Sequence, residues 1–458
     1  MFKPEKFTRK RACVLGSGRS GREAAQLLAR HGFSVLISEE HPLTRLPQMP
    51  AGIEWETGGH TERVFACEFI VKSPGIFPRH PVLKEARKRK IPVFSELEVA
   101  RAFMPKDICV LAVSGTNGKT TTTSLLGAIL AEHCARNLPT RKTFVTGNIG
   151  LPVSRVADEI RPHDFLVVEI SSYQLEDSTF FRPKVACLLN ITPDHLDHHG
   201  GMVNYIKAKA RLFKNQRAND VAVLNGGDAF CAALSREVKA QLKAFSAHAT
   251  HELKTDVFFD GDEIIFSEGY RLRPPKLKGI HNIENAMAAA LAALAVDVPA
   301  ETIQAVFNRF EPMEHRIEPF LEHDGVLFVN DSKATNLDST IIALKSFEKA
   351  PHIWLILGGR DKGASYEVLL PYLKSTCKRV LSIGECMDKI EKELKGEFPI
   401  IRCATLDKAV DYAADHAQKG DVVLLSPACA SFDQFTDYEQ RGRVFKELVG
   451  KKIRTLRR

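Results

Sequence analysis

The segment Gly115–Thr120, with the sequence Gly-Thr-Asn-Gly-Lys-Thr, constrains the fold of this chain more than any other, because it directly follows the apolar run 108–113. A buried strand that ends in a Gly-rich loop and continues into a helix directs successive backbone N–H groups at one point. The spacing departs from the standard P-loop, since Val113 stands where that pattern has its first glycine. Lys119 adds a positive charge, and Thr120 is placed to hold a magnesium ion between phosphates. The loop therefore predicts nucleotide triphosphate chemistry and a phosphate site made of Gly115, Thr116, Asn117, Gly118, Lys119 and Thr120.

The length of 458 residues is too great for one core, and three domains of about 150 residues each are expected. Apolar β-branched runs alternate with helical patterns, which predicts α/β layers with mostly parallel sheets. We expect a Rossmann-like N-terminal domain, a P-loop-type central ATPase domain and a Rossmann-like C-terminal domain. Their predicted bounds are 1–107, 108–312 and 313–458.

The net charge of +8 suits anionic substrates, although five basic residues lie among the first eleven positions and five among the last eight. Neither end interleaves aromatic with basic residues, so we interpret both as solvated tails and expect no nucleic-acid partner. The ten cysteines include no C-x-x-C pair, which is typical of free thiols in a reducing compartment. The start has no signal-peptide pattern, and no apolar run reaches the roughly 20 residues of a membrane span. A cytoplasmic monomer without a membrane span is therefore expected.

The first domain contains the segment Gly16–Gly21, which follows a strand and opens a helix. A second strand over 34–37 precedes Glu39 and Glu40, so that an acid stands about 20 residues after the glycines. This fingerprint predicts a pyrophosphate at the helix N-terminus without distinguishing NAD from another diphosphate nucleotide. A tight turn without a ligand is the alternative. Ser73-Pro-Gly75 follows the next strand, and alone it would be an ordinary turn.

Polar residues follow two further strands of the second domain. Glu169 ends the strand 165–168 beside the P-loop strand, where a magnesium-binding carboxylate is expected. The segment 190–199 is rich in Asp and His, but its spacing is not H-E-x-x-H and it has no cysteine partner. A polar loop with one histidine near a hard cation is therefore favoured over a zinc site.

Two predicted helices of this domain carry further candidates. The helix over 205–213 carries Lys207, Lys209 and Arg211, and such residues most often solvate a helix face. The helix over 282–291 places two asparagines, Asn282 and Asn285, on its first turn. Asn282 is either an N-cap or part of a pair that binds an adenine or a ribose.

Three polar segments of the third domain each follow a predicted strand: 330–336 (Asn-Asp-Ser-Lys-Ala-Thr-Asn), 358–362 (Gly-Gly-Arg-Asp-Lys) and 426–435 (Ser-Pro-Ala-Cys-Ala-Ser-Phe-Asp-Gln-Phe). The carboxyl ends of parallel strands meet at one edge of an open α/β sheet, where ligands bind. We therefore expect a substrate site there, although any one segment alone could be structural.

Together these residues resemble the Mur ligases, the ATP-dependent family that adds amino acids to the bacterial cell-wall precursor. The loop 115–120 has that family's form, and the segments 146–150 and 169–176 fit its D-glutamate-adding member. The segments 330–336 and 426–435 resemble those of the member that adds D-glutamate. The resemblance implies that ATP converts the carboxylate of UDP-MurNAc-L-alanine to an acyl phosphate, which the amine of D-glutamate then attacks. The protein's task is to position two anions and to neutralise charge.

The resemblance also implies catalytic and metal-binding roles for matched positions. Lys119 would hold the β- and γ-phosphates, and Glu169 and His195 resemble metal ligands. Lys209 matches a lysine that the family carbamylates with CO2, which supports a second Mg2+ ion. Lys207 lies two residues away, so that the choice of Lys209 depends on its offset of four from Tyr205. The implied metal ligands are Thr120, Glu169, His195 and Lys209.

Three further sets follow from the resemblance, and each serves one substrate. The ATP-binding set adds Asn282, Asn285, Arg316 and Asp331 to the phosphate loop. The set for the UDP substrate contains Gly18, Arg19, Ser20, Ser38, Glu39, Ser73 and Asn148. The D-glutamate set contains Lys333, Thr335, Lys362, Ser431 and Phe432. Two lysines there can answer two carboxylates. Ser38-Glu39 stands where an Asp-Thr type of pair is common in relatives, so the uracil and ribose contacts are expected to differ in detail.

Other functions fit part of the chain. A folate polyglutamate or murein-peptide ligase shares the chemistry, but the N-terminal fingerprint argues against the folate enzyme, as do the segments 330–336 and 426–435. An NAD-dependent oxidoreductase would leave the phosphate loop and Glu169 unused. A P-loop module that hydrolyses nucleotide to change partners is a third alternative. Phosphate release that needs both UDP-MurNAc-L-alanine and D-glutamate would favour the ligase over all of these.

Overall fold

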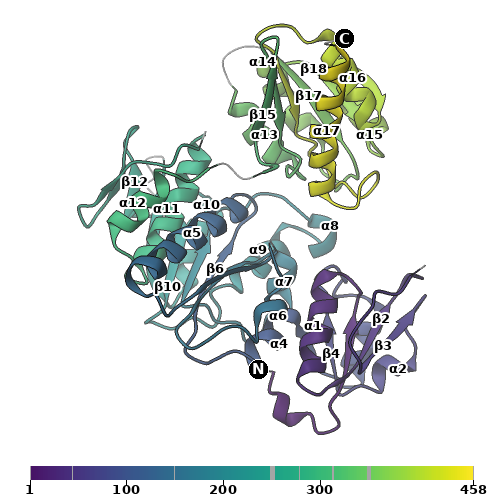
Figure 1. Cartoon of the computed structure of the whole chain (residues 1–458), viewed down its shortest axis with the longest axis vertical. Coiled ribbons are helices and arrows are strands. Elements are labelled where there is room, and N and C mark those ends of the chain that lie inside the picture. The colour runs from purple at the N-terminus through teal and green to yellow at the C-terminus, as the bar shows by residue number, and fades with distance from the viewer. Residues whose placement is uncertain are drawn as a thin grey trace. The chain divides into compact units, whose positions relative to one another are not determined.

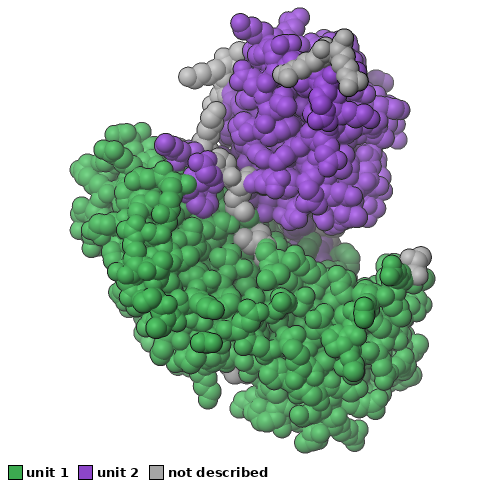
Figure 2. Space-filling view, in the orientation of Figure 1, with its two compact units in different colours: residues 1–191, 201–275, 282–309 green, residues 192–200, 276–281, 310–458 purple. Residues whose placement is uncertain are grey.

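The computed structural model of the chain describes residues 2–43, 45–148, 150–247, 253–277, 279–311, 314–347 and 352–456. Three sheets covered by helices make up this part of the chain (Figure 1). They divide between two compact units, which Figure 2 shows in green and purple. The first unit comprises 1–191, 201–275 and 282–309, and the second comprises 192–200, 276–281 and 310–458. The predicted three-domain α/β fold is confirmed, with two sheets in the first unit and one in the second. The predicted boundary at 312 and 313 lies outside the described residues.

The first sheet has five parallel strands in the order β3-β2-β1-β4-β5. Side chains alternate across β1, so that Ala12 and Val14 join an apolar cluster on one face while Cys13 and Leu15 join a cluster on the other. Because β1 and β4 are neighbours, the loops that follow them leave the same edge of the sheet. The elements are η1 (Pro4–Lys6), β1 (Arg11–Leu15), α1 (Arg19–Arg30), β2 (Ser34–Glu39), β3 (Ile53–Thr57), α2 (Glu62–Phe65), β4 (Phe69–Lys72), α3 (Pro81–Lys88), β5 (Val93–Ser95) and α4 (Glu96–Ala102).

The second sheet has nine strands in the order β14-β13-β12-β11-β10-β9-β6-β8-β7. Its strands are β6 (Cys109–Ser114), β7 (Thr143–Gly147), β8 (Phe165–Glu169), β9 (Val185–Leu188), β10 (Val221–Asn225), β11 (Gln241–Ser246), β12 (Val257–Phe259), β13 (Ile264–Phe266) and β14 (Arg271–Leu272). Neighbouring strands are parallel except in the pairs β12–β13 and β13–β14. The central strand β6 lies between β8 and β9, and all three are buried almost throughout, as in a sheet covered on both faces.

Helices follow most of these strands, which is the βαβ arrangement that the sequence predicted. They are α5 (Lys119–Asn137), α6 (Val153–Val156), α7 (Ser172–Glu176), α8 (Leu196–His199), α9 (Met202–Ala210), α10 (Ala229–Leu234), η2 (Ser235–Glu237), α11 (Ile280–Leu294) and α12 (Ala300–Phe307). The longest of the helices before α17 is α5, which begins directly at Lys119 of the phosphate loop.

Buried polar contacts join the first two sheets within the first unit. Glu96, at the start of α4, accepts hydrogen bonds of 2.6 Å from both the backbone N and the Oγ of Ser154. Lys72, at the end of β4, is 1% exposed and lies 2.6 Å from Asp177 Oδ2. Burial raises the pKa of Glu96, and it raises that of Asp177 although the charge of Lys72 acts in the opposite direction.

The third sheet has the order β15-β16-β20-β17-β18-β19, and only β15 runs antiparallel to its neighbour. Its elements are β15 (Glu318–His323), β16 (Val326–Asn330), α13 (Leu337–Lys345), β17 (Ile353–Gly358), η3 (Tyr366–Leu369), α14 (Leu370–Thr376), β18 (Cys377–Ile383), α15 (Met387–Leu394), β19 (Ile400–Ala404), α16 (Leu406–His416), β20 (Val422–Leu425) and α17 (Tyr438–Leu456). The polar segments after β16, β17 and β20 therefore leave one edge of three adjacent strands, as predicted.

Two local predictions were wrong, and one of two alternatives for Asn282 is excluded. The helix predicted over 205–213 ends at Ala210, and the chain then turns with Leu212 and Phe213 buried. Asn282 is not an N-cap, because α11 begins two residues earlier. The basic ends are not tails: Arg11 begins β1, and the last described basic residues lie in α17. Residues 457 and 458 are outside the described residues. No helix in the described part of the chain combines the length and the apolar character needed to cross a bilayer.

Candidate active site

The phosphate loop between β6 and α5 requires glycine at two positions. Gly115 has a φ of +152° and Gly118 a φ of +82°, so both adopt backbone conformations that side chains disfavour. A Cβ atom on Gly118 would lie 2.1 Å from Asn285 Oδ1 and 3.1 Å from Leu189 Cδ1. Gly118 therefore allows both the left-handed turn and the close approach of α11.

Neighbouring elements hold this loop in place. Asn190, directly after β9 and Leu189, accepts a 2.8 Å hydrogen bond from Asn117 N, and its backbone O accepts one of 3.0 Å from Thr116 N. Thr116 Oγ1 and Tyr205 Oη lie 2.9 Å apart. Asn285 accepts a hydrogen bond from Thr122 Oγ1 and donates one to Asn282 Oδ1. Asn285 of the predicted pair thus contacts the first turn of α5, and Asn282 is bonded to Asn285. The loop and the part of α11 from Asn282 onward belong to the first unit.

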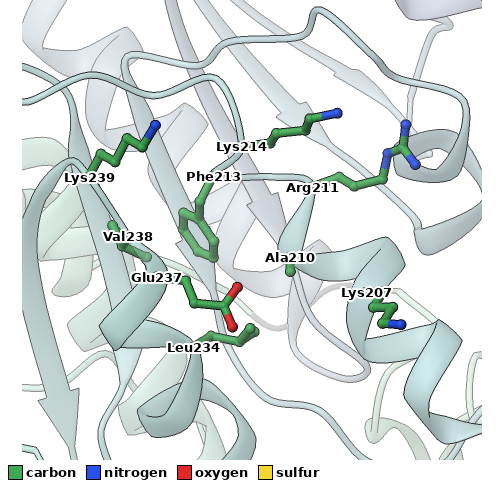
Figure 3. A pocket seen from close by; sticks show the side chains of 9 residues that line it. All are labelled: Lys207, Ala210, Arg211, Phe213, Lys214, Leu234, Glu237, Val238 and Lys239. Atoms are coloured by element: carbon green, nitrogen blue, oxygen red, sulfur yellow. The ribbon is translucent and has the colours of Figure 1, made fainter.

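Two lysines point at the carbonyl groups of the same loop. Lys119 Nζ donates hydrogen bonds to Gly115 O (3.0 Å) and Thr116 O (2.6 Å). Lys209 Nζ donates to Gly115 O at 2.7 Å, and its side chain is only 1% exposed. Lys207 is exposed and lines a separate hollow of about 350 Å³ beside α9 (Figure 3). Of the two lysines considered for the same role, only Lys209 contacts the loop.

Glu169 provides a buried carboxylate on the strand next to the loop. It ends β8 opposite Val113 of β6 and is 1% exposed. Its Oε1 accepts a 2.9 Å hydrogen bond from Asn148 Nδ2, whereas its Oε2 has no hydrogen-bond partner among the described residues. A buried carboxylate oxygen without a hydrogen-bond donor lowers stability unless a cation binds it. Oxygen ligands are also those that Mg2+ prefers, so this position fits a magnesium ligand.

His195 belongs to the second unit, which also contains the third sheet. It has a φ of +54° before α8, and its Nε2 lies 3.5 Å from Asp194 Oδ2. Asp194 in turn accepts a hydrogen bond of 3.0 Å from Asn336 Nδ2 and lies 3.4 Å from Lys362 Nζ. The segment before α8 is therefore held by two of the polar loops at the carboxyl edge of the third sheet.

Asp331 and Arg316, predicted to bind nucleotide, lie close together in the second unit. Asp331 follows β16, is buried, and accepts hydrogen bonds from Ser426 Oγ (2.7 Å) and Ile317 N (3.2 Å). Burial raises the pKa of Asp331 to about 7, although the hydrogen bond from Ser426 and the positive charge of Arg316 act in the opposite direction. The buried Nε of Arg316 has no hydrogen-bond partner in the described part of the chain.

The predicted D-glutamate residues all lie at the carboxyl edge of the third sheet, and their side chains differ in solvent exposure. Lys333 Nζ lies 5.1 Å from the ring centroid of Tyr438, Ser431 is 2% exposed and Phe432 is 61% exposed. Thr335 is half-buried in the loop after β16. Lys362, on the loop after β17, is the member of the set that contacts Asp194.

Arg441 of α17 is a residue that the sequence did not single out. Its side chain is 1% exposed and donates hydrogen bonds to Ser332 Oγ, Ser332 O and Cys429 O at 2.8–3.1 Å. Burial lowers the pKa of Arg441 to about 10. It joins the loop after β16 to the loop after β20 and so positions both. An arginine in an amphipathic helix gives no signal for this role in one sequence.

Six of the seven predicted UDP-substrate residues lie at the carboxyl edge of the first sheet, whereas Asn148 follows β7 of the second sheet. Gly18, Arg19 and Ser20 begin α1, and a Cβ on Gly16 would lie 2.9 Å from Ser73 Cβ, so the two loops are in close contact. Burial alone would raise the pKa of Glu39, but hydrogen bonds, chiefly from Ser17 N at 2.8 Å, lower it below its usual value.

The two residues of the predicted Ser38–Glu39 pair therefore differ in environment. Ser38 is fully buried, and its Oγ contacts both Glu56 Oε2 (2.6 Å) and His60 Nδ1 (2.7 Å). Neither Glu56 nor His60 was singled out from the sequence, because both are distant from the glycine fingerprint along the chain.

The sequence matches three domain families in order: the N-terminal domain of MurD-like Mur ligases over residues 10–95, the Mur ligase middle domain over 113–293, and the glutamate ligase domain of Mur ligases over 315–429. Together these matches cover most of the chain. The chain belongs to the Mur ligase family. The predicted family and enzyme class are thus confirmed.

Curated relatives of this Mur ligase match it over nearly their whole length. A protein of Elusimicrobium minutum named UDP-N-acetylmuramoylalanine–D-glutamate ligase is 52% identical, and the match covers 98% of this chain and 99% of the relative. A protein of Koribacter versatilis with the same name is 46% identical, with 96% and 97% coverage.

Solved structures of more distant Mur ligases share the fold. The UDP-N-acetylmuramate–alanine ligase of Thermotoga maritima has a TM-score of 0.62 at 17% identity and covers 96% of this chain and 99% of its own. A murein peptide ligase of Psychrobacter arcticus has a TM-score of 0.59, also at 17% identity, covering 96% and 98%. At this identity the likeness supports the three-domain fold and not the choice of acceptor.

Proposed function

We propose that this Mur ligase joins D-glutamate to UDP-N-acetylmuramoyl-L-alanine, with ATP consumed to activate the carboxylate, in the synthesis of the peptidoglycan precursor. The observation that carries the proposal is the 52% identity, over nearly the full length, to a protein named for this reaction. Mur ligases use ATP and Mg2+. A carboxylate is a poor electrophile, so its phosphorylation supplies the leaving group that the amine of D-glutamate displaces.

The proposed ATP site is the loop between β6 and α5. The N-terminus of α5, which begins at Lys119, would face the phosphates as expected of an anion site, whereas Thr116 N and Asn117 N donate to Asn190. Lys119 Nζ donates hydrogen bonds to two carbonyl groups of the loop. A phosphate bound in the loop would accept hydrogen bonds from Lys119 in their place. Thr120, Glu169 and His195 are the proposed Mg2+ ligands. The bound Mg2+ would neutralise phosphate charge and withdraw electrons from the transferred phosphoryl group.

Lys209 is the proposed site of the carbamate that supports a second Mg2+ ion. Its ammonium is buried beside Gly115 O, and burying an ammonium is costly. The uncharged amine of Lys209 adds CO2 and releases one proton. The product is a carbamate, so a negatively charged carboxylate takes the place of the buried ammonium. We also propose that Asn282 and Asn285 contact the nucleoside, with Arg316 and Asp331 completing the nucleotide site.

The acceptor and donor sites follow the other two sheets. Lys333 and Lys362 would each answer one carboxylate of D-glutamate, with Thr335, Ser431 and Phe432 forming the rest of the pocket. Gly18, Arg19, Ser20, Ser38, Glu39 and Ser73 would bind the UDP portion, with Asn148 near the metal. We propose the domain bounds 1–107, 108–312 and 313–458 and a cytoplasmic location for the enzyme.

Phosphate release by the purified enzyme tests this function. We expect release from ATP only when UDP-MurNAc-L-alanine and D-glutamate are both present. Release that needs neither substrate would contradict the proposal, as would release with L-amino acids in place of D-glutamate.

A further inference from the structure

Three side chains at the carboxyl edge of the first sheet form a cluster that the proposed reaction does not use. Glu40 follows β2, His60 follows β3, and His80 lies between β4 and α3. One possible ligand atom from each residue lies within 4.8 Å of those of the other two. Two imidazoles and one carboxylate at this spacing are a ligand set typical of Zn2+.

A hydrogen-bond chain orients His60 as a ligand. Ser38 Oγ donates to Glu56 Oε2 at 2.6 Å, so the same hydroxyl oxygen is an acceptor for His60 Nδ1 at 2.7 Å. The proton of the neutral imidazole is thereby held on Nδ1, and the lone pair is on Nε2. Histidines that bind metal usually donate their other ring N–H in this way, and the acceptor fixes the orientation of the ring.

The other two side chains complete the cluster. His80 Nε2 lies 3.5 Å from Glu40 Oε2, and the rings of His60 and His80 are nearly perpendicular, with centroids 5.5 Å apart. His80 Nδ1 accepts a long hydrogen bond of 3.4 Å from Val82 N at the start of α3. An ion on Nε2 would place the ring proton on Nδ1, so this long bond from Val82 N would be lost.

A second cluster of histidine and glutamate side chains differs from this one in the charges that surround it. In the second unit, Glu314 and Glu318 flank His315, but Lys446 Nζ lies 2.9 Å and 2.8 Å from the two carboxylates and neutralises them. Within the described residues, neither lysine nor arginine pairs with Glu40. The carboxylate of Glu40 is therefore available to a cation.

We propose that Glu40, His60 and His80 bind one Zn2+ ion. Three protein ligands leave one tetrahedral position open to water or to an oxygen of another ligand. Ser38 and Glu39, which directly precede Glu40, are proposed contacts of the UDP substrate. Zn2+ at this site therefore changes the affinity for UDP-MurNAc-L-alanine, a consequence that also rests on the proposed function.

Metal binding is tested on the whole chain after removal of metals with a chelator. Zn2+ is titrated by calorimetry in the presence of excess Mg2+, which occupies the proposed magnesium sites. The variants Glu40→Gln and His60→Ala are compared with His163→Asn, which changes an exposed histidine of the same unit at a positive φ that asparagine tolerates. Co2+ replaces Zn2+ in a second measurement, because its visible spectrum distinguishes four-coordinate from six-coordinate sites. Melting temperatures without metal show whether each variant is folded.

We expect one Zn2+ per chain with a four-coordinate Co2+ spectrum, unchanged in His163→Asn. Glu40→Gln and His60→Ala should each weaken binding by more than about tenfold, and Ser38→Ala by about 10- to 100-fold through loss of the His60 acceptor. Equal Zn2+ affinity in wild type, Glu40→Gln and His60→Ala would overturn the site, as would a six-coordinate spectrum. A KM for UDP-MurNAc-L-alanine that Zn2+ leaves unchanged would overturn only the coupling, and failure of all turnover would instead contradict the proposed function.

Discussion

Replacing Gly118 with alanine tests whether the geometry of the phosphate loop depends on its contact with α11. An alanine at a φ of +82° costs about 1–2 kcal/mol in backbone strain, partly offset by about 0.4–1 kcal/mol through the loss of freedom in the unfolded chain. Its Cβ would also meet Asn285 Oδ1 at 2.1 Å. Moving Asn285 breaks its hydrogen bonds to Thr122 and Asn282, each of which contributes about 1 kcal/mol. The free energy of unfolding should therefore fall by about 3 kcal/mol in total.

Gly269→Ala is the matched control for Gly118→Ala. Gly269 belongs to the same unit and has a φ of +93°, but a Cβ there has nothing within 4 Å. Its substitution should cost only the backbone strain, about 1 kcal/mol after the offset.

Urea unfolding followed by circular dichroism compares the two variants, and calorimetric titration measures ATP binding. We expect weaker ATP binding in Gly118→Ala alone. If both variants lose the same stability and both bind ATP like the wild type, the contact between α11 and the loop does not have the role described.

Three further substitutions have expected outcomes. Lys119→Ala should abolish ATP-dependent turnover while leaving the binding of UDP-MurNAc-L-alanine intact by calorimetry, and simultaneous loss of both would contradict the division into domains. Lys209→Ala should lose activity in the phosphate-release assay, with partial recovery by Lys209→Glu or by added short carboxylic acids; full activity of the alanine variant would refute the carbamate. Asp331 binds a proton in the folded state up to about pH 7 but in the unfolded state only to about pH 4, so its contribution to stability falls as pH rises through this window. Asp331→Asn should remove up to a few kcal/mol of that loss in urea unfolding between about pH 4 and 7. Parallel pH profiles for the two proteins would contradict the raised pKa.

The sequence predicted the elements of the site where a strand ends in a polar loop. Parallel strands bring their carboxyl ends to one edge, so the loops after β16, β17 and β20 could be placed together from periodicity alone. The basic C-terminus was misjudged although a signal was present. Phe445, Val449 and Ile453 recur every four residues and are the buried face of α17.

Contacts between residues distant in the chain could not be predicted from one sequence. Neither the approach of Asn285 to Gly118 nor the hydrogen bonds of Arg441 leave a local pattern, because both depend on packing between separate elements. The end of α9 was missed for a related reason. Leu212 and Phe213 continue the apolar spacing of the helix and are buried, while the backbone has already turned after Ala210.

The transfer of oxygen from the substrate carboxylate to phosphate tests the central claim most directly. UDP-MurNAc-L-alanine labelled with oxygen-18 in its terminal carboxylate is incubated with the enzyme, ATP, Mg2+ and D-glutamate, and the phosphate released is measured by mass spectrometry. Activation as an acyl phosphate predicts that each phosphate carries one labelled oxygen, with the other retained in the amide product. Unlabelled phosphate formed at the rate of product formation would contradict it.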